Sequence, residues 1–125
     1  MATLLVLEDE PSDIVILREI LKPDILVEAS SAEQALQLFI EHDRKVDLLI
    51  ADVTLPTSSG IQVALLLRSE IPDLPVILAC DEQLSAWDDQ HLAELNRLGA
   101  HMVAVLEKPL LQVDLRCLMK VGREI

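Results

Sequence analysis

Short aliphatic runs alternate with amphipathic stretches along this chain. The aliphatic runs predict five β-strands, which span Thr3–Leu7, Ile25–Ala29, Val46–Ala51, Val76–Cys80 and Met102–Leu106. Between them, apolar residues recur at helical spacing. Repeated strand-then-helix units predict an α/β domain whose parallel sheet is connected by right-handed crossovers and covered by helices on both faces.

Capping and helix-breaking residues predict where the helices begin and end. Ser12 is the expected N-cap of the first helix, which must stop before Pro23. The segment Ser30–Gln34 offers a capping box that starts at either of its serines. Gly99 is expected to end a helix in the polar stretch before it, and a last helix is expected around Leu111–Val121.

Composition indicates a folded chain despite its high charge. Of the 125 residues, 51% are hydrophobic, while 22 acidic side chains against 10 basic ones give a net charge of −12. Disordered acidic chains lack such apolar content. Since Phe39 and Trp87 are the only aromatic residues, Leu, Ile, Val and Ala must fill the core. We expect one domain that spans residues 1–125.

The same features exclude several classes of protein and partner. The apolar runs are far shorter than the ~20 residues that span a bilayer. The start, MATLLVLEDE, lacks the basic region of a signal peptide. Two cysteines, Cys80 and Cys117, make no disulfide framework, which favours the reducing cytoplasm. A charge of −12 repels nucleic acid and anionic membranes, so neither is expected as a direct partner.

Candidate chemistry gathers where the predicted strands end, which is where open α/β sheets bind ligands. The acidic run Glu8–Glu10 follows the first strand, Asp52 follows the third, and Lys108 follows the fifth. Carboxylates this close together repel one another unless a cation binds between them. Ligands that are all oxygen atoms, with no histidine or cysteine among them, favour Mg²⁺ over Zn²⁺. Mg²⁺, a carboxylate and a lysine together suit a phosphoryl group. An acidic run alone is usually a solvated turn. The prediction of a phosphoryl site therefore rests on the acidic run, Asp52 and Lys108 taken together.

Three segments give the chain a resemblance to a known family. They are LLVLEDEP with Glu8 and Asp9, LLIADVTLPTSSG with Asp52 and Gly60, and EKPL with Lys108. In this order they resemble the acidic pair, the phosphoacceptor motif and the Lys-Pro pair of the receiver (response-regulator) domain of two-component signalling. The resemblance covers essentially the whole chain. It implies a flavodoxin-like (βα)5 three-layer sandwich with strand order 2-1-3-4-5.

The resemblance also implies a role for each residue. Asp52 would accept a phosphoryl group from the phosphohistidine of a sensor histidine kinase or histidine phosphotransferase. Mg²⁺ would be held by Asp9, Asp52 and the backbone carbonyl of Thr54, with Glu8 acting through water. Lys108 would pair with Asp52 and then with the phosphoryl oxygens, because a carboxylate attacks an anionic phosphate poorly until cations offset their repulsion. The chain would be a signalling domain with a downstream protein partner rather than an enzyme.

Three positions depart from the family pattern. Cys80 replaces the Thr or Ser that ends the fourth strand, and a thiol is a weaker hydrogen-bond donor than a hydroxyl. Asp81 follows where a small residue is usual, and Val105 replaces an aromatic residue that moves on activation. We therefore expect intact phosphoryl chemistry with an atypical output switch.

Two alternatives remain open at this point. The departures at Cys80, Asp81 and Val105 also fit a degenerate receiver that binds a partner without phosphorylation. A Mg²⁺-dependent phosphatase with Asp9 as nucleophile is disfavoured, because Pro11 stands where a second Asp is needed and no cap domain is present.

Overall fold

The computed structural model describes residues 3–21, 25–53, 59–80 and 87–107. Within these residues, strands and helices alternate as the hydrophobic pattern predicts. The strands are β1 (Thr3–Leu7), β2 (Ile25–Ala29), β3 (Leu48–Asp52), β4 (Val76–Cys80) and β5 (Val103–Glu107). The helices are α1 (Pro11–Ile20), α2 (Ala32–Glu41), α3 (Gly60–Glu70) and α4 (Asp89–Leu98). The helix predicted at Leu111–Val121 lies outside the described residues.

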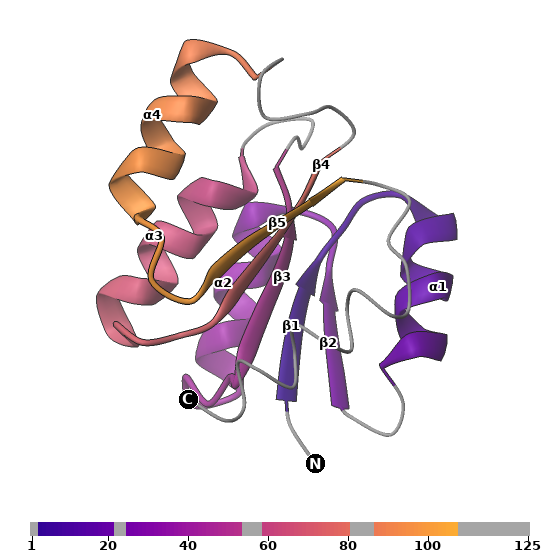
Figure 1. Ribbon diagram of the computed structural model, residues 1–125. Helices are drawn as coiled ribbons and strands as arrows, with labels where there is room; N and C mark the ends of the chain where they lie inside the picture. Colours follow the sequence, from indigo (N-terminus) through magenta and orange to yellow (C-terminus); the bar gives the residue numbers. More distant parts are fainter. Residues whose placement is uncertain (1–2, 22–24, 54–58, 81–86, 108–125) are drawn as a thin grey trace.

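The strands form one parallel sheet in the order β2-β1-β3-β4-β5. Helix α1 covers one face, while α2, α3 and α4 cover the other (Figure 1). This arrangement confirms the predicted flavodoxin-like fold. From β1 the chain goes outward to β2 and then returns to β3 on the other side of β1. The carboxyl ends of β1 and β3 therefore lie at the switch point, where such sheets bind ligands.

Aliphatic side chains form a core on each face of the sheet. Alternate strand residues belong to opposite cores: Leu5, Leu49 and Leu78 lie in the core that includes α2, α3 and α4, and Leu4, Ile50 and Ile77 lie in the core that includes α1. All residues of β3 and β4 are buried. Full burial explains why these central strands are continuous aliphatic runs rather than alternating ones.

The start of α1 corrects the sequence prediction. The helix begins at Pro11 with Glu10 as its N-cap, so Ser12 is already inside the first turn and does not cap it. Proline fits this first position because the missing N–H has no partner within the helix there. The N-cap therefore lies two residues earlier than predicted, which shortens the turn after β1 by two residues.

Two strands differ from the prediction at both of their ends: β3 ends at Asp52 rather than Ala51, and β5 ends at Glu107 rather than Leu106. β3 begins at Leu48 rather than Val46, and the carboxylate of Asp47 accepts a hydrogen bond from the N–H of Thr3 at 2.8 Å. β5 begins at Val103, because Met102 has a φ of 54°, a left-handed conformation outside the strand region.

Capping residues set the ends of two other helices. Of the two serines offered for α2, Ser31 is the N-cap, and its hydroxyl accepts from the N–H of Gln34 at 3.1 Å. The side chain of Gln34 in turn accepts from the N–H of Ser30 at 2.8 Å. Gly99, with a φ of 83°, ends α4 as predicted. Among the helices that the structure describes, none has the length and apolar character needed to cross a membrane.

Candidate functional site

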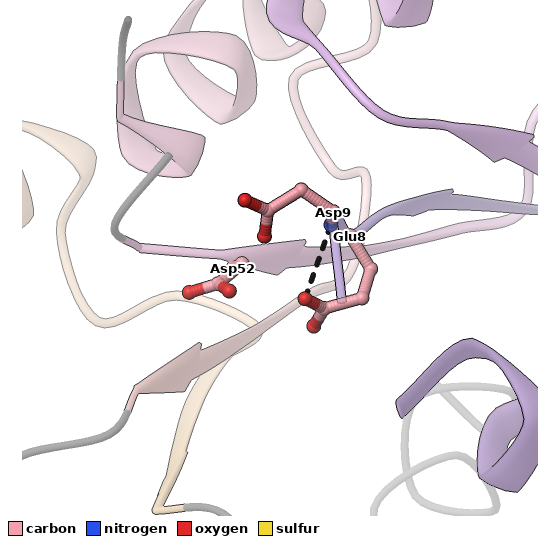
Figure 2. A group of neighbouring side chains, drawn as sticks. All are labelled: Glu8, Asp9 and Asp52. Atoms are coloured by element: carbon pink, nitrogen blue, oxygen red, sulfur yellow. Dashed lines mark hydrogen bonds between the residues drawn. The ribbon is translucent and has the colours of Figure 1, made fainter. Parts of the chain in front are cut away.

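Three carboxyl groups meet at the carboxyl ends of β1 and β3. The strand register pairs Leu7 with Ala51, so Glu8 and Asp52 follow on neighbouring strands, and Asp9 comes next along the chain. One carboxyl oxygen from each of the three acids lies within 4.8 Å of the other two (Figure 2). The structure thus brings Glu8, Asp9 and Asp52 together, as the positions of the strand ends predict.

Glu8 is held in place by the backbone of its own turn. Its side chain is only 2% exposed, and one oxygen, Oε1, accepts hydrogen bonds from the N–H groups of Asp9 and Glu10, each at 3.1 Å (Figure 2 draws the first). The N–H of Glu8 donates to the carbonyl of Ala29 at 3.0 Å on β2. Two backbone donors satisfy part of a carboxylate that would otherwise be costly to bury. This turn therefore fixes the acidic pair before any ligand binds.

Asp52 lies at the bottom of the site and Asp9 at its rim. Asp52 is 4% exposed at the end of a fully buried strand, whereas Asp9 is exposed to solvent. A ligand can therefore approach from the side of Asp9.

The first residue of α3 lies directly against the backbone of Asp52. A Cβ atom on Gly60 would overlap the carbonyl oxygen of Asp52 and would lie 2.9 Å from the Cβ of Ala51. The N–H of Gly60 donates to the carbonyl of Val53 at 3.2 Å. Gly60 thus serves a steric purpose: it lets α3 begin in contact with the strand that carries Asp52. The sequence contains this glycine, but only the packing gives the reason for it.

Cys80 occupies the end of β4, one residue beyond the partner of Asp52 in the strand register. Its side chain is buried, and the thiol donates to the carbonyl of Leu106 on β5 at 3.5 Å. Val105, which stands where the family pattern has an aromatic residue, lies partly buried on β5. Both residues therefore lie on the strands where the sequence predicts them, Cys80 at the carboxyl end of β4 and Val105 in the middle of β5, where it pairs with Leu78.

The donor set of the cluster suits a hard cation. Three carboxylates with no imidazole or thiolate among them match the oxygen ligands that Mg²⁺ prefers. Lys108, Asp81 and Thr54, which also belong to the predicted site, lie outside the described residues.

A family model for the response regulator receiver domain matches residues 4–120. This chain belongs to that family. Receiver domains act in two-component signalling, bind Mg²⁺ at an acidic pocket, and interact with histidine kinases or phosphotransfer proteins. In this chain the structure shows one acidic cluster among the described residues, formed by Glu8, Asp9 and Asp52.

Solved structures of receiver domains share the fold. The signal receiver domain of an HD domain-containing protein from Pseudomonas fluorescens Pf-5 is 25% identical, with a TM-score of 0.81 over 98% of this chain and 94% of that one. A receiver domain protein from Clostridium thermocellum is 23% identical, with a TM-score of 0.81 over 99% and 95%. Chemotaxis protein CheY4 from Vibrio cholerae is 20% identical, with a TM-score of 0.80 over 98% of each chain. The search of curated proteins finds no match to this receiver domain.

Proposed function

We propose that Asp52 accepts a phosphoryl group from the phosphohistidine of a sensor histidine kinase or histidine phosphotransferase, in a Mg²⁺-dependent reaction. The convergence of the Glu8, Asp9 and Asp52 carboxyl oxygens within 4.8 Å carries this proposal. The proposed domain spans residues 1–125 and works in the cytoplasm.

The proposed transfer uses one carboxyl oxygen of Asp52 as the nucleophile. A bond forms between this oxygen and phosphorus while the bond from phosphorus to the donor's imidazole nitrogen breaks, and that nitrogen keeps the electron pair. The product is an acyl phosphate on Asp52. Because Asp52 is buried at the bottom of the site and Asp9 lies at its exposed rim, the donor must approach over Asp9.

The acids around Asp52 would hold the metal. Asp9 and Asp52 would be direct ligands, with the backbone carbonyl of Thr54 and, through water, Glu8. Bound there, Mg²⁺ would supply positive charge against the phosphoryl oxygens. Lys108 would supply a second positive charge beside Asp52. The turn that ties Glu8 to the N–H groups of Asp9 and Glu10 supports this arrangement, because it fixes the acidic pair in advance.

The response to phosphorylation should be weaker than in a receiver with a hydroxyl at position 80. The thiol of Cys80 donates to the Leu106 carbonyl, and a thiol is a weak donor to a phosphoryl oxygen. Val105 offers no aromatic ring to move inward. The weak donor at Cys80 and the missing ring at Val105 also motivate a second candidate function, a degenerate receiver that binds a partner without phosphorylation.

Incubation with acetyl phosphate and Mg²⁺, followed by intact-protein mass spectrometry, tests the proposal. We expect the mass to increase by one phosphoryl group in the wild type and in Asp73→Asn, a control at an exposed aspartate, but not in Asp52→Asn. Omission of Mg²⁺ should prevent the increase. If the folded wild type gains no phosphoryl group from acetyl phosphate or from a panel of histidine kinases, the degenerate-receiver alternative holds instead.

A further inference from the structure

Helix α4 carries a glutamate on its buried side. Along this part of the chain the buried residues are Trp87, Glu94 and Leu98, so Glu94 lies between two apolar side chains of the stripe that faces the core. Glu94 is only 6% exposed. Both of its carboxyl oxygens are buried, and neither has a hydrogen-bond partner among the described residues.

This arrangement differs from that of Glu8, the other buried glutamate among the described residues. Glu8 accepts two backbone hydrogen bonds, whereas Glu94 has lost water without gaining a donor from the described part of the chain. A polar group in that state destabilises the fold, and a donor that reaches it recovers the lost hydrogen bonds. The strongest donors to a carboxyl group are cationic ones.

Glu94 also lines an open groove between α3 and α4, which lie side by side (Figure 1). The groove has a volume of about 520 Å³. Helix α3 contributes Gln62, Leu65 and Leu66, and Leu66 is 52% exposed. Helix α4 contributes Gln90 beside Glu94. The groove therefore combines apolar surface, two side-chain amides and one carboxyl group that finds no donor among the described residues.

We propose that this groove binds a basic side chain, arginine or lysine, of a partner protein, with Glu94 as its acceptor. The exposed Leu66 and the half-buried Leu65 would cover the aliphatic part of such a side chain, and the amide oxygens of Gln62 and Gln90 would accept further hydrogen bonds. The net charge of −12 attracts a basic partner over longer distances. Because its oxygens are buried, Glu94 must rotate toward the groove when the partner binds. The groove shares no residue with the Glu8, Asp9 and Asp52 cluster.

Arg97 is the competing cation. It lines the same groove, one helical turn beyond Glu94, and no ion pair joins the two among the contacts of the described residues. Its guanidinium repels a basic ligand and can itself turn toward Glu94. Replacing Arg97 with glutamine should therefore strengthen binding of an external cation.

NMR titration of the full chain with N-acetyl-arginine amide tests the proposal, with the uncharged N-acetyl-citrulline amide as the matched ligand control. We expect saturable changes in amide chemical shifts that are confined to the groove around Gln62, Leu66 and Gln90. The neutral variant Glu94→Gln should weaken binding about tenfold or more, the loss expected for one charge-assisted hydrogen bond. The control Glu33→Gln, at an exposed glutamate of α2, should bind as the wild type does.

Several results would overturn the proposal. Shifts that do not saturate, that spread over the whole surface, or that citrulline amide reproduces would exclude recognition of a basic side chain. Equal binding by Glu94→Gln and by a second variant, Glu94→Met, would exclude the glutamate as acceptor. Binding that occurs only in Arg97→Gln would show that Arg97 occupies Glu94 in the native protein. Saturation by spermidine but not by the arginine ligand would indicate a small-molecule amine site instead.

Discussion

Replacement of Gly60 by alanine tests how closely α3 approaches the strand that carries Asp52. The added methyl group would overlap the carbonyl oxygen of Asp52, and it would lie 2.9 Å from the Cβ of Ala51. Backbone atoms cannot rotate away as the end of a side chain can. The helix or the strand must therefore shift, and we expect the free energy of unfolding to fall.

Two effects of opposite sign determine how much the free energy of unfolding changes in Gly60→Ala. Alanine is the better helix former and would stabilise α3 by up to about 1 kcal/mol. Overpacking against a rigid neighbour costs about 1–3 kcal/mol, and an overlap with backbone belongs at the upper end of that range. The new methyl group would lie closer than van der Waals distance to three atoms of the strand, the carbonyl carbon and oxygen of Asp52 and the Cβ of Ala51. We therefore expect a net loss of about 1–2 kcal/mol in the free energy of unfolding. For a domain of this size, that lowers the melting temperature by about 4–8 °C.

Urea unfolding, monitored by circular dichroism, measures the loss of stability. The rate of phosphorylation by acetyl phosphate measures how the substitution affects the site around Asp52. Gly99→Ala is the control, because Gly99 has a φ of 83° and a methyl group added to it would have no neighbour within 4 Å. It should lose stability through backbone strain alone and leave the phosphorylation rate unchanged. Gly60→Ala should lower both. A Gly60→Ala variant as stable as the wild type, or more stable, would show that helix propensity dominates and would refute the steric argument.

Three further predictions concern charged groups. Mg²⁺ at ten times its dissociation constant should stabilise the wild type by about 1.4 kcal/mol, measured as a rise in melting temperature. The rise should be lost in Asp52→Asn. If Mg²⁺ added to metal-free wild type leaves the melting curve unchanged, that result would contradict the cation site. Arg18 bridges Glu28 with two hydrogen bonds of 2.6 Å, and the hydrogen bond from its guanidinium lowers the pKa of Glu28. The ion pair therefore stabilises the fold at pH values above the ordinary pKa of Glu28, and this stabilisation is lost as the pH falls through the lowered pKa. Glu28→Gln should make the protein less stable to urea at neutral pH and should have no such effect in strong acid. Equal effects of the substitution at both pH values would contradict the prediction. Glu94→Met should raise the free energy of unfolding by about 1–2 kcal/mol in urea titrations, because it removes a buried polar group that has no partner among the described residues; a loss of stability would indicate that the carboxyl group has a donor in solution.

The sequence predicts the fold because a parallel sheet covered on both faces requires continuous aliphatic strands, and these are visible without a structure. The sequence does not predict those helix and strand ends that depend on the backbone conformation or the contacts of a single residue. Met102 adopts a left-handed conformation that delays β5 by one residue. Arg68 shows the same limit for tertiary contacts, because its guanidinium donates to the carbonyls of Leu74, His101 and Met102, which come from two separate connections. Nothing in the local pattern around Arg68 indicates these acceptors.

The candidate site was predictable to the extent that strand ends determine it. Glu8, Asp9 and Asp52 are neighbours because β1 and β3 are neighbours, and that order follows from the family resemblance. The hydrogen bonds that hold Glu8 were not predictable, because they depend on the side chain turning back toward its own backbone. Leucine spacing indicates the helix α4 but not which of its side chains are buried: Leu98 is buried, Leu92 and Leu95 are only half buried, and the polar Glu94 is buried as well.

The two glutamates that are buried in the described part of the chain show why burial alone does not identify a ligand site. Glu8 and Glu94 are exposed to similarly small extents, 2% and 6%. For Glu8, the turn after β1 supplies two N–H donors, so its burial is compatible with the folded chain by itself and serves to position Asp9. For Glu94, the described chain supplies no donor, and its place in the stripe would suit an apolar side chain. The missing partner, rather than the charge or the burial, is therefore the observation that points outside the chain. It separates the α3–α4 groove from the many acidic side chains that only keep this strongly hydrophobic protein in solution.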